Sequence, residues 1–97
     1  MVKESAKNLS EDDIVFAPQA AEDYDYWAQR DDKILNRINN LIDNILQTPF
    51  EGLGKPEPLR FELSGCWSRR INHQHRLVYR VQDGELHILS CRYHYIK

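Results

Sequence analysis

The sequence predicts a small α+β domain in which a hairpin of two helices packs on a twisted, mainly antiparallel sheet of about four to five strands. Two adjacent stretches in the first half have helical periodicity, and three runs in the second half have the alternation of strands. A loop rich in proline and glycine separates the two halves. Because 97 residues allow a single modest core, residues 14–97 are predicted to form one domain.

The beginning of the chain combines a polar extension with a short strand. Residues 1–13 are polar and show no sustained period, so they are predicted to be a flexible extension. The apolar run Ile14, Val15 and Phe16 ends before Pro18, which predicts a first strand with Pro18 in the first turn of the next helix.

Two amphipathic helices are expected next. Residues 19–30 place apolar side chains, including Trp27, on the core face and acidic side chains on a solvated face. Asp31 and Asp32 can cap a second helix, whose wide apolar stripe ends before Thr48. The short connection makes the two helices antiparallel neighbours. Their apolar stripes can be buried if the helix pair packs on one face of a sheet.

The second half of the chain is expected to form most of the sheet. Residues 48–59 hold three prolines and two glycines, which predicts a loop rather than a helix or a central strand. Strand-like runs follow at 66–72, 75–81 and 85–93, and Asp83-Gly84 predicts a tight hairpin between the last two. The first strand of the domain would then join at one side of this sheet.

The middle strand is expected to have one apolar face and one basic face. The two alternating sets are Leu77, Tyr79 and Val81 against Arg76, Val78 and Arg80. The first set can meet the helices, and the second set predicts a basic face on the other side. Trp67 shares the parity of Ile71, which favours a place in the core over stacking on a base.

Charge is distributed unevenly along the chain. The formal net charge is −2, but residues 52–97 hold eight basic and four acidic side chains, a net charge of +4. Residues 1–51 are correspondingly acidic. A phosphate ligand would therefore bind the second half.

Neither the cysteines nor the histidines predict a special site. Cys66 and Cys91 have no C-x-x-C spacing and are expected to be reduced, buried thiols. His73 and His75 have no cysteine or carboxylate at ligand spacing, so no metal is expected. No apolar run approaches the ~18 residues that span a membrane, and the start lacks the apolar segment of a secretory signal, so we expect a cytoplasmic protein.

Three side chains could together cleave RNA without a metal. The reaction needs a base for the 2′-OH, a cation for the phosphorane and an acid for the 5′ oxygen. Glu57 lies between two prolines that stiffen its backbone, Arg76 lies on the basic face, and His94 precedes Tyr95 near the chain end. Taken one at a time, local sequence favours solvent-exposed side chains without a role for all three, and alternation does not fix the face of His94.

Five blocks of sequence, in order, resemble the YoeB/Txe toxins of the RelE superfamily. They are DYDYW at 23–27, TPFEGLGKPEPL at 48–59, LSGCWSRRIN at 63–72, HRLVY at 75–79 and CRYHY at 91–95. The resemblance implies a RelE-like fold and the toxin of a type II toxin–antitoxin system. Such a toxin enters the ribosomal A site, cleaves translated mRNA without a cofactor, forms a homodimer and binds a YefM/Phd-like antitoxin.

The resemblance also assigns roles to individual residues. Glu57 would be the general base, Arg76 the phosphate-stabilising cation and His94 the general acid, which gives a 2′,3′-cyclic phosphate or 3′-phosphate and a 5′-OH. The residues implied to contact the substrate are Tyr95, Lys55, Arg60, Arg69 and Arg70. The chain departs from the family pattern in its polar N-terminal extension and in Ile96-Lys97 after the terminal His-Tyr.

Two other functions compete with the nuclease. A ParE-like inhibitor of DNA gyrase has the same fold, but the presence of Glu57, Arg76 and His94 together argues against it. A non-catalytic protein that only binds an antitoxin or the ribosome is the other alternative. Such a protein would stay equally toxic after His94→Ala.

Overall fold

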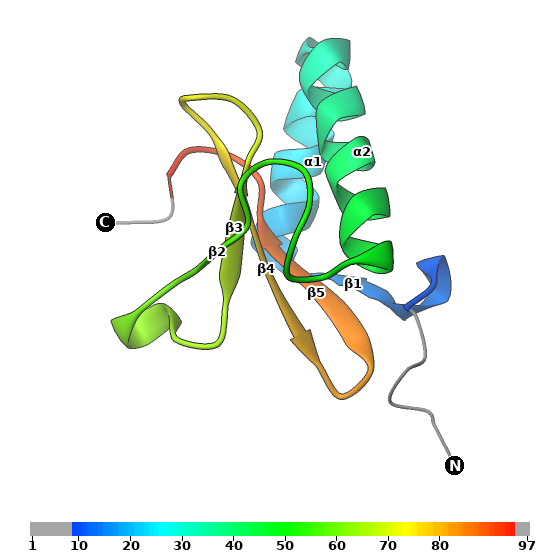
Figure 1. Cartoon of the computed structure of the whole chain (residues 1–97). Helices are drawn as coiled ribbons and strands as arrows, with labels where there is room; N and C mark the ends of the chain where they lie inside the picture. Colours follow the sequence, from blue (N-terminus) through cyan, green and yellow to red (C-terminus); the bar gives the residue numbers. More distant parts are fainter. Residues whose placement is uncertain (1–8, 95–97) are drawn as a thin grey trace.

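The two helical stretches form an antiparallel hairpin joined by a single residue. In the computed structural model, which describes residues 9–94, α1 spans Pro18–Arg30 and α2 spans Asp32–Gln47 (Figure 1). Pro18 starts α1, where its missing N–H costs nothing. The Asp31 carboxylate caps α2 by accepting hydrogen bonds from the backbone N–H groups of Lys33 and Ile34, both at 3.1 Å. Both predicted helices are confirmed.

Five strands form one sheet in the order β1-β5-β4-β3-β2. Their bounds are β1 (Ile14–Phe16), β2 (Glu57–Pro58), β3 (Trp67–Arg70), β4 (Arg76–Gln82) and β5 (Glu85–Ser90). β1 pairs parallel with β5 at one edge, and every other pair is antiparallel, as predicted. Asp83 and Gly84 connect β4 and β5 with φ of 55° and 78°, the positive values of a tight hairpin turn.

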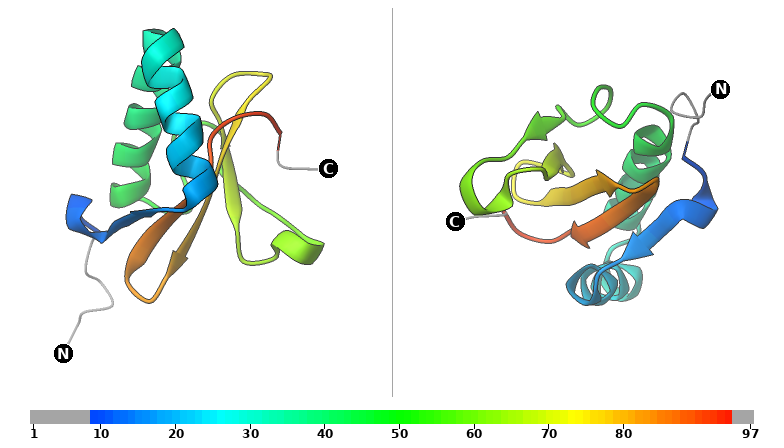
Figure 2. Two further views of the ribbon diagram at one scale, coloured as in Figure 1. Left: turned by 180° about the vertical axis from the view of Figure 1, so that it is seen from behind. Right: turned by 90° about the horizontal axis from the view of Figure 1, so that it is seen from below.

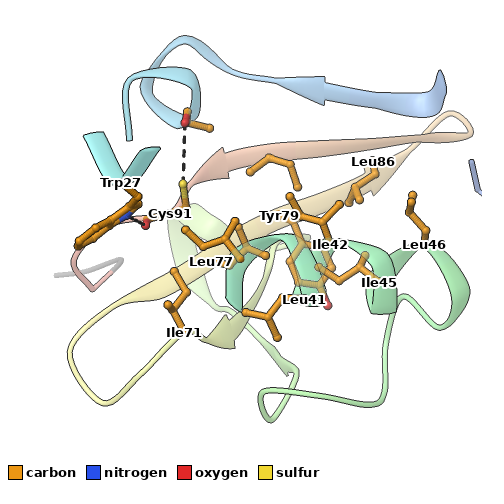
Figure 3. Packing of buried hydrophobic residues seen from close by; sticks show 13 residues of the cluster. Trp27, Leu41, Ile42, Ile45, Leu46, Ile71, Leu77, Tyr79, Leu86 and Cys91 are labelled. Atoms are coloured by element: carbon orange, nitrogen blue, oxygen red, sulfur yellow. Dashed lines mark hydrogen bonds between the residues drawn. The ribbon is translucent and has the colours of Figure 1, made fainter. Parts of the chain in front are cut away.

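The main core lies between the helical hairpin and one face of the sheet. Figure 3 shows Leu41 and Ile45 of α2 among Leu77, Tyr79 and Leu86 of the sheet, all without exposed surface. Trp27 of α1 is 6% exposed, and half-buried Trp67 packs against the same cluster. The core positions predicted for both tryptophans are therefore confirmed. Cys66 and Cys91 are free and buried, also as predicted.

The sheet face away from the helices is only partly basic, which corrects the prediction. Leu59, Cys66 and Val78 form a second, smaller cluster on this face, with Leu63 and Leu89 packed against it. Leu59 and Leu63 belong to the connection between β2 and β3, which includes the short helix η3 (Phe61–Leu63) and extends away from α1 and α2 (Figure 2). The Arg80 guanidinium borders this cluster, with Nη2 at 3.6 Å from Cys66 Sγ.

Part of the expected flexible N-terminal extension packs on the domain. Residues 9–13 are ordered, because Leu9 packs against the main core and Glu11–Asp13 form the short helix η2. The Asp13 carboxylate accepts a hydrogen bond from the backbone N–H of Ser10 at 2.9 Å. Residues 1–8 lie outside the described residues. Within the described part of the chain, neither helix is long and apolar enough to span a membrane.

Candidate active site

Glu57 and Arg76 project from the same face of the sheet. Glu57 pairs with Ser68, which pairs with Val78, and one row further along the sheet Arg70 pairs with Arg76. Directly paired residues point to the same side, and these rows alternate with the buried rows that face the helices. Strand spacing and rise place the Cα atoms of Glu57 and Arg76 roughly 12 Å apart, close enough for both side chains to flank one phosphate.

Arg69 organises the loop that leads to Glu57. Its side chain has no exposed surface, and all five of its N–H groups donate hydrogen bonds of 2.5–3.1 Å. The acceptors are the carbonyls of Thr48, Glu51 and Leu53 and the side chains of Asn44 and Tyr79. The guanidinium thereby satisfies carbonyl groups at and beyond the C-terminal end of α2, where a positive charge is favourable.

The predicted RNA contact of Arg69 is therefore wrong. A side chain without exposed surface or spare donors cannot reach a phosphate. Strand alternation contains the reason, because Arg69 pairs with Leu77 on the face that meets the helices. The neighbouring Arg70 is exposed and lies beside Arg76 on the other face, where it remains a candidate.

The loop comes close to the sheet just before Glu57. The Gly54 carbonyl accepts a hydrogen bond from the Arg70 backbone N–H at 2.7 Å, and a Cβ at Gly54 would lie 2.9 Å from the Leu41 side chain. Its φ of 80° also favours glycine. Lys55 and Arg60, on either side of the two-residue strand β2, are exposed, as is Glu57 itself.

Arg76 has a fixed guanidinium with donors to spare. Its Nη1 donates to the carbonyl oxygens of Asn72 at 2.7 Å and His75 at 3.1 Å. Among residues 9–94, Nε and Nη2 donate to no protein group, so three N–H groups can serve a ligand. A half-buried guanidinium held in this way is prepared for a phosphate.

The chain end brings His94 to Arg76. After β5, the backbone runs beside the beginning of β4, where the Arg76 N–H donates to the Tyr93 carbonyl at 3.0 Å. His94 follows directly and is exposed. It borders a pocket of about 440 Å³, whose other lining residues include Leu63, Val78, Leu89 and Ser90. Tyr95 lies outside the described residues.

Two buried side chains of α1, Asp23 and Trp27, hold this chain end, and the role of Asp23 was not predicted from the sequence. Asp23 is 3% exposed and accepts a hydrogen bond from the Cys91 N–H at 2.9 Å, and Trp27 Nε1 donates to the Cys91 carbonyl at 2.8 Å. Asp23 thus departs from the solvated acidic face expected for α1. Burial, and secondarily the Asp23 charge, raises the pKa of the Cys91 thiol to about 12.

The chain is similar to known proteins over most of its length. The model of the YoeB-like toxin of bacterial type II toxin–antitoxin systems matches residues 16–95. Toxin YoeB of Escherichia coli (strain K12) is 52% identical over 82 residues, which cover 84% of this chain and 98% of the relative.

Solved structures resemble the whole described fold. A YoeB/ParE toxin from Agrobacterium tumefaciens has a TM-score of 0.82 at 46% identity, covering 84% of this chain and 98% of its own. YoeB from Staphylococcus aureus, solved as a dimer, has a TM-score of 0.81 at 50% identity, covering 92% and 100%. The YoeB-YefM complex from Staphylococcus aureus gives 0.80 at 49% identity, with the same coverage. The chain therefore belongs to the YoeB-like toxins of bacterial type II toxin–antitoxin systems.

Proposed function

We propose that this toxin is a ribosome-dependent endoribonuclease that cleaves mRNA in the ribosomal A site and so inhibits translation in the cytoplasm. Membership of the YoeB-like family supports the proposal. The observation that carries it is the arrangement of the strands and of the chain end that hold Glu57, Arg76 and His94. Glu57 and Arg76 share a sheet face, and a backbone hydrogen bond joins Arg76 to Tyr93, the residue before His94.

Cleavage begins when Glu57 removes the proton of a ribose 2′-OH. The 2′ oxygen then attacks the neighbouring phosphorus and forms a phosphorane that carries two negative charges. A carboxylate suits this step because its ordinary pKa near ~4.3 leaves it ionised at neutral pH. Pairing with β3 at the edge of the sheet holds the Glu57 backbone in place.

Arg76 and His94 complete the reaction. The free N–H groups of Arg76 stabilise the phosphorane, and exposed Arg70 beside it adds positive charge. The bond between phosphorus and the 5′ oxygen breaks as His94 donates a proton to that oxygen. The products are a 2′,3′-cyclic phosphate, which water can open to a 3′-phosphate, and a 5′-OH. Side chains supply every proton transfer.

Relatives suggest the partners. YoeB from Staphylococcus aureus has been solved as a dimer and in complex with YefM. We infer that this chain likewise forms a homodimer and binds a YefM/Phd-like antitoxin. Substrate binding would involve Lys55, Arg60 and Arg70 in the described part of the site, and Tyr95 beyond it.

The test is mRNA cleavage in a reconstituted translation system, mapped by primer extension with and without ribosomes. We expect cuts only with ribosomes, and a loss of at least about 10²-fold in rate for Glu57→Gln and His94→Ala. Exposed Glu62→Gln and His73→Ala are matched controls that should cut normally. Growth arrest with intact mRNA would contradict the nuclease, and a supercoiling assay would then test gyrase inhibition.

A further inference from the structure

The chain end that carries His94 is held at two successive points. At Cys91 the contacts come from Asp23 and Trp27 of α1, as described above. At Tyr93 they come from the start of β4: the Tyr93 N–H donates to Nδ1 of His75 at 2.7 Å, and its carbonyl accepts from Arg76. These contacts fix the backbone immediately before His94.

His75 lies where these elements meet. It is 7% exposed, and its ring contacts the Trp27 ring edge-on, with centroids 4.8 Å apart. The Tyr93 ring lies on another side, at 5.7 Å. The His75 backbone N–H donates to the Asn72 side chain at 2.8 Å, which fixes the turn that contains His75. The imidazole is therefore held in one orientation.

The turn around His75 also supports Arg76. The carbonyls of Asn72 and His75 accept hydrogen bonds from the Arg76 guanidinium, while the His75 imidazole accepts one from Tyr93. The turn that contains His75 thus orients the Arg76 guanidinium directly. The same turn holds the segment before His94 through the hydrogen bond from Tyr93.

From this geometry we propose that His75 is a positioning residue, whose neutral imidazole accepts a hydrogen bond from the Tyr93 backbone N–H and thereby sets His94 against Arg76. The inference rests on the proposed nuclease function. Nδ1 must be unprotonated to accept, so a doubly protonated His75 would release Tyr93. The Tyr93 phenol packs against the ring, and the groups whose charge acts on it are Arg92, His94, Arg76 and Asp23. Three of the four favour the neutral form.

Two variants at His75 separate this role from general packing. Asn can present its Oδ1 near the place of Nδ1, whereas Leu fills a similar space without an acceptor. We expect His75→Leu to lower the single-turnover cleavage rate on ribosomes by about 10²-fold, with ribosome affinity nearly unchanged. His75→Asn should restore much of the rate. Exposed His73→Leu, in the same turn, is the matched control and should cleave normally.

Amide hydrogen exchange gives a readout that does not depend on cleavage. In His75→Leu the Tyr93 amide should lose protection while the Tyr79 amide in β4 keeps it, which shows that the variant is folded. Normal cleavage and Tyr93 protection in His75→Leu would overturn the inference. If His94→Ala alone abolishes cleavage, the nuclease function still stands. If wild type leaves mRNA intact, that function fails, and unchanged Tyr93 protection in His75→Leu would then also refute the hydrogen-bonding role.

Discussion

At the scale of single residues, Arg69 and Arg70 demonstrate how much one position along a strand matters. They are adjacent and chemically identical, yet one is buried among five acceptors and the other is exposed beside Arg76. The family resemblance covered both equally. Only the pairing of Arg69 with buried Leu77 separates a structural arginine from a candidate RNA contact.

Replacing Arg69 by Met should destabilise the fold. The substitution leaves carbonyl and side-chain acceptors without donors at the end of α2. We expect the free energy of unfolding to fall by about 3 kcal/mol, measured by urea denaturation in a His94→Ala background. Arg70→Met is the control and should change it by less than about 0.5 kcal/mol. Equal effects would contradict the structural assignment of Arg69.

Replacing Phe61 by Asn should stabilise the fold. Phe61 has a φ of 58° and is 87% exposed, so its ring contributes little burial while its backbone is strained. Asn tolerates this region better, and the free energy of unfolding should rise by about 0.5–1 kcal/mol in the same urea experiment. A decrease would indicate that the ring makes a stabilising contact.

At the scale of elements, sequence periodicity predicted the helices and strands that form the core. It did not predict features that depend on single long-range contacts. The stripe of α2 and the alternation of β4 could be predicted because each element buries one face, and the exposed Asp83-Gly84 turn because its two residues tolerate a positive φ. Asp23 was missed because its partner, the Cys91 amide, lies 68 residues away. The order of residues 9–13 depends on Leu9 reaching the core, which no local pattern indicates.

The buried imidazole of His75, in the turn before β4, should make the stability of the fold depend on pH. Burial, together with nearby Arg92, lowers the pKa of His75 below its ordinary value of 6.5, so the folded state disfavours the proton. The unfolded chain binds that proton more readily, and the His75 contribution is lost as pH falls from about 6.5 through the lowered pKa. Urea midpoints between pH 7.5 and 5 should fall less steeply for His75→Asn than for wild type. His73→Asn should behave as wild type does.

At the scale of the whole molecule, acidic side chains of the first half of the sequence and basic side chains of the second half lie at different edges of the sheet. The acidic residues of η2 are adjacent to β1, at the other edge of the sheet from β2 and the candidate site. The described part of the extension therefore does not cover the basic side chains. Residues 1–8 are not part of that description.

Ribosome binding should depend on salt through these basic side chains. Each cation that neutralises an RNA phosphate releases counterions, so affinity falls as salt concentration rises. Arg60→Gln should weaken binding and reduce the slope of log affinity against log salt by about 0.7–1. Filter binding across 50–200 mM salt measures this, with Arg30→Gln on α1 as the control. An unchanged slope would remove Arg60 from the contacts.

The two buried thiols, Cys66 and Cys91, can report on local opening of the fold. Cys66 belongs to the small cluster beneath the β2–β3 connection, and Cys91 belongs to the main core under the helices. Because the sheet separates them, they cannot form a disulfide within the folded chain. Each instead becomes reactive only when its own side of the protein opens. The alkylation rates of the two cysteines therefore report separately on breathing near Glu57 and on unfolding of the helical layer.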